Sequence, residues 1–131
     1  MALMKKNYSK LVSAAKDALK KSYSPYSRIK VGVAALGASG KVYTGVNVEN
    51  ASYGLTICAE RAAVFNAVTG GEKKIKAVAI VWNRPGFAVP CGACRQVIAE
   101  FGKDADIVMA SKNGKYKVAK LSKLLPSCFS L

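Results

Sequence analysis

Three cysteines in the middle of the chain have the spacing of metal ligands. Cys91 and Cys94 stand three residues apart, as in a C-x-x-C pair, and Cys58 can supply a third thiolate. Three thiolates on a divalent metal leave one coordination position for water, which is the arrangement of an open catalytic site. We therefore expect one Zn²⁺ ion per chain, held by these three residues.

Glu60 stands two residues after the first of these cysteines. A closed structural zinc site has no chemical use for a carboxylate there, whereas a catalytic site needs a base beside a metal-bound water. Arg61 comes next, and its positive charge can offset that of the thiolates. The pattern favours an enzyme in which Glu60 moves protons and Arg61 supports the metal ligands.

Three other interpretations of the cysteines are open. Cys128 could complete a closed four-thiolate zinc site, although its proline-containing polar surroundings do not resemble a C-x-x-C knuckle. A redox role for Cys91 and Cys94 would leave Cys58 and Glu60 without a purpose. A non-catalytic zinc module that binds a partner would keep the cysteines but would need no Glu60. We expect Cys128 to be a free thiol.

Composition narrows the function further. The 131 residues are predicted to form one domain, 1–131, and the hydrophobic content of 51% indicates a globular protein. The chain contains no histidine, which excludes a Ser-His-Asp triad and any imidazole metal ligand. No apolar run is long enough to span a membrane and no secretion signal is evident, so we expect a cytoplasmic protein without membrane partners.

The chain is strongly basic. Lysine and arginine number 21 against 7 acidic residues, which gives a formal charge of +14. Such a charge favours polyanions, but the lysines are spread along the chain and few alternate with aromatic residues as in a stacking platform. We therefore interpret the charge as a solvated basic surface and expect no nucleic-acid partner.

The elements that must position the site follow from periodicity. Helical spacing predicts helices over 5–22, 58–68 and 91–102 with a last turn over 121–125, and alternating or unbroken apolar runs predict strands over 29–36, 41–49, 75–82, 106–110 and 116–119. This order predicts an α/β fold, a three-layer α/β/α sandwich around one mixed five-stranded sheet. The cysteines then lie at helix starts, where the helix dipole favours thiolates.

The second predicted strand has a polar face. Its period of two places Tyr43, Asn47 and Glu49 on one side, opposite Val42, Val46 and Val48. A solvent-facing edge is the ordinary explanation of such a pattern. The loop 50–54, however, leads directly to Cys58, so we expect Asn47 and Glu49 to lie near the metal.

Taken together, the motifs resemble a known family. Cys58-Ala59-Glu60 followed by Pro90-Cys91-Gly92-Ala93-Cys94 is similar to the zinc-dependent cytidine deaminases of the small homotetrameric type. The likeness also includes the stretches 23–27, 31–32, 44–55, 91–97 and 124–126, together with Phe129. It therefore extends over nearly the whole chain.

The resemblance implies a hydrolase of pyrimidine salvage that converts cytidine and deoxycytidine to uridine and deoxyuridine plus ammonia. In such zinc deaminases a metal-activated hydroxide attacks C4 of cytosine while a glutamate that is not a metal ligand, here Glu60, shuttles protons. Further implied are ribose contacts from Asn47 and Glu49 and a pyrimidine contact from the Ala59 N–H. The resemblance also implies a homotetramer in which Tyr53 and Phe129 reach a neighbouring subunit's site.

One position departs from the family pattern, and two related activities are open. Where the family usually carries an aromatic residue that packs on the pyrimidine, this chain has Ile29, whose aliphatic face can still cover a ring. Deaminases of aminonucleoside antibiotics share the chemistry. Deaminases of bases in nucleic acid do so too, but their parallel last strand conflicts with the Asn113-Gly114 hairpin signal.

Overall fold

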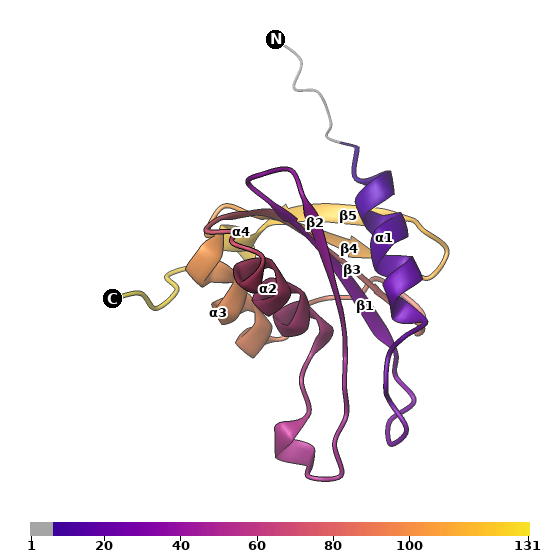
Figure 1. Cartoon of the computed structure of the whole chain (residues 1–131). Helices are drawn as coiled ribbons and strands as arrows, with labels where there is room; N and C mark the ends of the chain where they lie inside the picture. The colour runs from indigo at the N-terminus through magenta and orange to yellow at the C-terminus, as the bar shows by residue number, and fades with distance from the viewer. Residues whose placement is uncertain (1–6) are drawn as a thin grey trace.

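The computed structural model describes residues 7–131 and arranges them in three layers around a five-stranded sheet (Figure 1). Helix α1 covers one face of the sheet, and α2, α3 and α4 lie on the other. In chain order the elements are α1 (Ser9–Leu19), β1 (Val31–Gly37), β2 (Val42–Val46), a 3₁₀ turn (Tyr53–Leu55), α2 (Ala59–Thr69), β3 (Ile75–Trp82), α3 (Gly92–Phe101), β4 (Asp106–Ala110), β5 (Tyr116–Lys120) and α4 (Leu121–Leu124).

The strand order is β2-β1-β3-β4-β5. Strand β1 pairs antiparallel with both β2 and β3, β3 and β4 are parallel, and β4 and β5 form an antiparallel hairpin. The predicted three-layer fold with a mixed sheet is therefore confirmed, as is the hairpin at Asn113-Gly114, where Gly114 takes the left-handed φ of 90° that such a turn requires.

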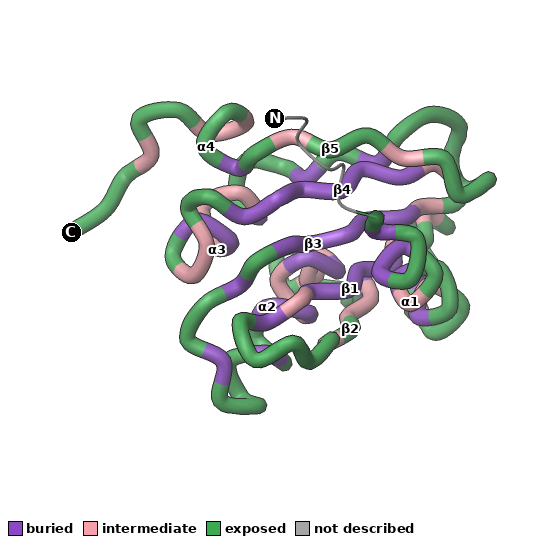
Figure 2. The backbone as a smooth tube through the Cα atoms, turned by 90° about the horizontal axis from the view of Figure 1, so that it is seen from above, coloured by how far each residue is buried: buried purple, intermediate pink, exposed green. Residues whose placement is uncertain are grey.

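The three inner strands are buried on both faces, as Figure 2 shows for β3 and β4. Alternate residues pack on opposite layers, so Ala34, Ala77 and Ala79 face α1 while Val33, Val78 and Ile80 face α2 and α3. The sheet therefore divides the core into two separately packed halves, one against α1 and one against α2 and α3.

Two glycines let the helices approach the sheet closely. A Cβ atom at Gly32 would lie 2.2 Å from the Ala15 carbonyl oxygen of α1, and one at Gly45 would lie 2.3 Å from the Ala63 nitrogen of α2. No side chain fits at either position. The first turns of α2, which follow Cys58, are therefore held directly against β2.

Several predicted boundaries were wrong by a few residues. The first helix begins at Ser9 and ends at Leu19, while positions 5 and 6 of the predicted helix lie outside the described residues. The first strand begins at Val31 rather than at residue 29. Cys58 and Cys91 each precede the first helical residue instead of opening the helix.

The largest correction concerns the second strand, which was predicted over 41–49. Strand β2 ends at Val46, and Val48 makes isolated bridges with Tyr23 and Ile57. The alternating face proposed for Asn47 and Glu49 therefore does not exist as a strand face. Within residues 7–131, no helix combines the length and the apolar character needed to cross a membrane.

Candidate metal centre

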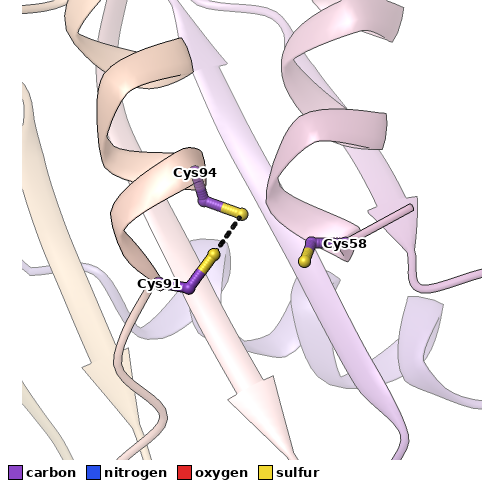
Figure 3. Close-up of side chains that lie close together, drawn as sticks. All are labelled: Cys58, Cys91 and Cys94. Carbon is purple, nitrogen blue, oxygen red and sulfur yellow. Dashed lines mark hydrogen bonds between the residues drawn. The ribbon is translucent and has the colours of Figure 1, made fainter. Parts of the chain in front are cut away.

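The three cysteines predicted as metal ligands lie together at two neighbouring helix starts (Figure 3). Cys58 precedes α2, Cys91 precedes α3, and Cys94 lies in the first turn of α3. Their Sγ atoms all lie within 4.8 Å of one another, and those of Cys91 and Cys94 are 3.4 Å apart. Among residues 7–131, no other three cysteine or carboxylate side chains lie close enough together to hold a metal ion.

The separations suit a zinc ion. With Zn–S bonds of about 2.3 Å, tetrahedral geometry places neighbouring sulfur atoms about 3.8 Å apart. The Cys91–Cys94 sulfur distance of 3.4 Å is close to that value, the three sulfur atoms lie within 4.8 Å of one another, and three thiolates are a ligand set that zinc prefers. The cluster also runs from the fully buried Cys94 to the exposed Cys91, so one side of it is open to a small molecule.

Charge at the cluster is arranged for thiolates. The pKa of Cys58 falls to about 5, because Cys94 hydrogen-bonds to its sulfur and the Arg61 guanidinium donates to it at 3.3 Å. The pKa of the Cys94 thiol rises in turn, because it is bonded to the Cys58 thiolate and is buried. Two unpaired helix N-termini add partial positive charge at the same place. The site therefore favours a thiolate at Cys58 before any metal binds.

Arg61 is held against this charge. Its contact with the Cys58 sulfur raises the pKa of the guanidinium, so the side chain remains fully protonated. Its Nε atom is buried and has no hydrogen-bond partner within residues 7–131. Arg61 thus lies beside Cys58, a predicted metal ligand, where the charge of the guanidinium balances that of the thiolate.

Glu60 is buried beside the cysteines. Only 6% of the residue is exposed, and burial raises the pKa of its carboxyl to about 7, with a further contribution from the Cys58 thiolate. Interaction with Cys94 acts in the opposite direction and lowers the pKa of the carboxyl. A carboxyl with a pKa near neutrality can both take and give a proton under physiological conditions.

A second feature is a cavity of about 350 Å³ near the end of β2. It is lined by Tyr26, Ser27, Glu49, Tyr53 and Thr56. The Glu49 carboxylate accepts hydrogen bonds from the N–H groups of Tyr26 at 2.9 Å and Ser27 at 3.1 Å, and from the Ser27 hydroxyl. These bonds hold the pKa of Glu49 below its usual range, and the bond from the Ser27 hydroxyl has the largest effect. The cavity therefore presents a permanent negative charge.

Asn47 has a different environment from Glu49. Its side-chain oxygen accepts the Val31 N–H at 2.9 Å, and its side-chain nitrogen donates to the Ile29 carbonyl at 2.7 Å. Only 8% of the residue is exposed. Asn47 thus fixes the start of β1, a structural role that the sequence reasoning did not identify.

The remaining predicted residues differ in position. Ala59 is fully buried and, as the first residue of α2, has a backbone N–H without an intrahelical acceptor. Ile29 is half-buried, whereas Tyr53 is 74% exposed and packs edge-on against Tyr26 with ring centroids 5.8 Å apart. Phe129 is 71% exposed and does not line the cavity of its own chain.

Comparison with known proteins agrees with this geometry. Residues 5–111 match the family described as the cytidine and deoxycytidylate deaminase zinc-binding region. The chain belongs to this family.

Individual members of the deaminase family are similar over almost their full length. The cytidine deaminase of Sporosarcina psychrophila is 43% identical over 92% of this chain and 90% of its own. The crystal structure of the Burkholderia pseudomallei cytidine deaminase is 45% identical with a TM-score of 0.90, covering 95% of this chain and all of that one. The Mycobacterium tuberculosis cytidine deaminase structure is 39% identical with a TM-score of 0.84, and the match covers 97% of this chain and 100% of that one.

These matches confirm the family resemblance and the zinc-binding cysteine cluster. The closed four-thiolate alternative is not supported, because Cys128 is absent from the cluster and lies in a separate pocket beside Leu121 and Leu125. The antiparallel β4–β5 hairpin likewise disagrees with the parallel last strand expected of deaminases that act on nucleic acid.

Sequence reasoning assigned no role to Arg95, which lies in the cysteine motif. Its guanidinium donates to the Pro90 carbonyl at 2.9 Å and to the Leu124 carbonyl at 2.9 Å. These contacts tie the residue that precedes Cys91 to α4. The signal was present as an arginine directly after Cys94, but nothing in the local pattern gives its long-range acceptor.

Proposed function

We propose that this chain is a hydrolase that converts cytidine and deoxycytidine to uridine and deoxyuridine with release of ammonia. The observation that carries the proposal is the buried Glu60 beside three clustered thiols. A zinc ion held by Cys58, Cys91 and Cys94 supplies the Lewis acidity that makes a water nucleophilic at neutral pH. The family match and the full-length similarity to cytidine deaminases support the same activity.

The residues of the chain divide the remaining work. Glu60 accepts a proton from the attacking water, delivers it to N3 of the pyrimidine and then helps to protonate the leaving amine. The carboxyl can do both because its pKa lies near 7. The free Ala59 N–H donates to the pyrimidine carbonyl, and burial of Ala59 keeps water from competing for that bond.

Glu49 and Asn47 form the ribose side of the proposed site. Glu49 lines the 350 Å³ cavity as a carboxylate, which accepts hydrogen bonds from ribose hydroxyls. Asn47 holds the adjoining backbone and has one amide hydrogen left beyond its bond to Ile29. Ile29 supplies an aliphatic surface for the pyrimidine ring.

We also propose that the active form is a homotetramer with sites shared between subunits. Tyr53, Leu55 and Phe129 are each more than 70% exposed, which is costly for large apolar side chains on a monomer. A neighbouring subunit that covers the loop and the tail would remove this cost. Tyr53 and Phe129 would then close the site of an adjoining subunit.

Loss of ultraviolet absorbance by cytidine tests the activity, with Glu60→Gln as the paired variant. The wild type is expected to convert cytidine to uridine. Glu60→Gln keeps the shape of the side chain but removes proton transfer, so turnover should fall by about 10²- to 10⁴-fold while zinc content is retained. Wild-type activity on an aminonucleoside antibiotic but not on cytidine would overturn the substrate assignment, and Glu60→Gln activity within about tenfold of wild type would overturn the role of Glu60.

A further inference from the structure

Two asparagines stand directly after the two strands that flank β1, and they hold the same loop between them. The loop consists of residues 24–30, here called the pocket loop, which connect α1 to β1 and contribute Tyr26 and Ser27 to the 350 Å³ cavity. Asn47 follows the last residue of β2, and Asn83 follows the last residue of β3. The pocket loop itself forms neither helix nor strand, so side chains must fix its course.

Asn83 makes three hydrogen bonds to this loop. Its side-chain oxygen accepts the Lys30 N–H at 3.0 Å, and its side-chain nitrogen donates to the Arg28 carbonyl at 3.1 Å. Its own backbone N–H donates to the Lys30 carbonyl at 3.1 Å. One residue therefore holds the backbone on both sides of Ile29.

The side-chain amides continue the sheet where the strands stop. At the start of β1, the last backbone pairs of the sheet are Val31–Trp82 toward β3 and Gly32–Val46 toward β2. Beyond these pairs the amide groups of Asn83 and Asn47 offer a donor and an acceptor to the loop, as a strand backbone would. Asn47 binds the Ile29 carbonyl from one side while Asn83 binds its two neighbours from the other.

The loop needs such support. Arg28 has a φ of 61°, a left-handed conformation that non-glycine residues adopt at a cost and retain only when surrounding contacts enforce it. The Asn83 amide bonds the Arg28 carbonyl directly. Without that bond the loop is free to relax toward commoner backbone angles, which would move Ser27 and Ile29 relative to Glu49.

We propose that Asn83 is a positioning residue for nucleoside binding, because it fixes the pocket loop, which lines the cavity and contains Ile29. The inference rests on the proposed function, since it assigns the cavity to the nucleoside. Asn83 acts through the loop and not on the reacting atoms. Its loss should therefore weaken substrate binding without affecting the metal or the proton transfer by Glu60.

Asn83→Ala tests this role. We expect the KM for cytidine to rise by about fivefold, with kcat and zinc content unchanged, because two hydrogen bonds to the loop are lost. Asn83→Asp keeps the acceptor for Lys30 but loses the donor to Arg28, so its KM should lie between those of the wild type and Asn83→Ala. Amide hydrogen exchange at Lys30 should be faster in Asn83→Ala. The control is Asn113→Ala, which loses bonds in the distant β4–β5 turn and should leave KM unchanged.

A double-mutant cycle with Ile29→Ala separates positioning from general stability. If Asn83 acts through Ile29, the effects of the two substitutions on KM should be less than additive. Additive effects, an unchanged KM in Asn83→Ala, or a fall in kcat equal to that in kcat/KM would each overturn the inference while leaving the proposed function intact. A wild type that does not turn over cytidine would instead overturn the proposed function, and with it the role of Asn83.

Discussion

At the scale of single residues, the centre depends on charges that compensate one another. Three thiolates carry more negative charge than one zinc ion neutralises, and the Arg61 guanidinium lies 3.3 Å from the Cys58 sulfur. Glu60 is buried next to the same sulfur, so its proton affinity depends on how completely that charge is balanced. The pKa values of Cys58, Glu60 and Arg61 therefore depend on one another.

The cysteines differ in what their replacement should do. We expect Cys94→Ser to lose zinc and deaminase activity, because a neutral hydroxyl is a poor zinc ligand and Cys94 is fully buried in the cluster. Cys128→Ser should retain both, since Cys128 lies in a separate pocket. Metal analysis of the two purified variants is the measurement. Loss of zinc from Cys128→Ser would restore a fourth-thiolate role.

At the scale of elements, α2 is positioned by contacts near its start and just after its end. Gly45 lets the helix touch β2, and at its other end Glu72 joins the following loop to the β1–β2 turn. The Glu72 carboxylate accepts the Ser39 N–H at 3.2 Å, the Ser39 hydroxyl, and the Tyr43 hydroxyl at 2.9 Å. This buried carboxylate fixes α2 against the hairpin.

The Glu72 contacts predict a pH dependence of stability. The hydrogen bond from the Ser39 hydroxyl, followed by those from its backbone and Tyr43, lowers the pKa of Glu72 in the folded protein. A lowered folded pKa gives stability that is present above the unfolded value of about 4.3 and is lost as pH falls through the folded value. Glu72→Gln should therefore be less stable than wild type at pH 7, and the difference should shrink on acidification.

Denaturant unfolding at pH 7 and at successive acidic values measures this difference. The matched control is Glu100→Gln, which changes an exposed carboxylate on α3. The control should change little at neutral pH. A constant difference between Glu72→Gln and wild type across the acidic range would contradict the assigned role of the carboxylate.

At the scale of the whole molecule, a formal charge of +14 must be reconciled with assembly. Four such chains repel one another at low ionic strength unless the contact between them is large and apolar. The exposed Tyr53, Leu55 and Phe129 provide apolar surface for such a contact. Charge and exposed apolar area therefore oppose each other in the proposed tetramer.

Sedimentation at two salt concentrations tests the balance. We expect the assembly to tighten as salt is added, because salt screens the repulsion between like-charged subunits and leaves apolar contacts in place. A chain truncated after Pro126 loses Phe129 and should show deaminase activity lower by about tenfold or more, if Phe129 completes a neighbouring site. A fully active monomer, or a truncated chain with wild-type activity, would contradict shared sites.

The sequence alone was sufficient for the features that depend on local spacing. Apolar patterns and turn signals predicted the helices α1 to α4 and the strands β1 to β5, and the predicted bounds of β3 and β4 are those observed because both strands are short and mostly apolar. Cysteine spacing and Glu60 indicated zinc chemistry for the same reason. Ligand spacing within one helical turn is a local property that a sequence states directly.

Only the tertiary structure decided the contacts that join distant segments. Cys58 meets Cys91 and Cys94 because α2 and α3 start side by side, and that depends on the packing of both helices on the sheet. Strand β2 ends at Val46, and the Asn47 amide beyond it bonds to Ile29 and to Val31 at the start of β1. The acceptors of Asn83 and Arg95 are likewise distant in the chain. Such partners are set by register and packing, which the local pattern of a sequence does not contain.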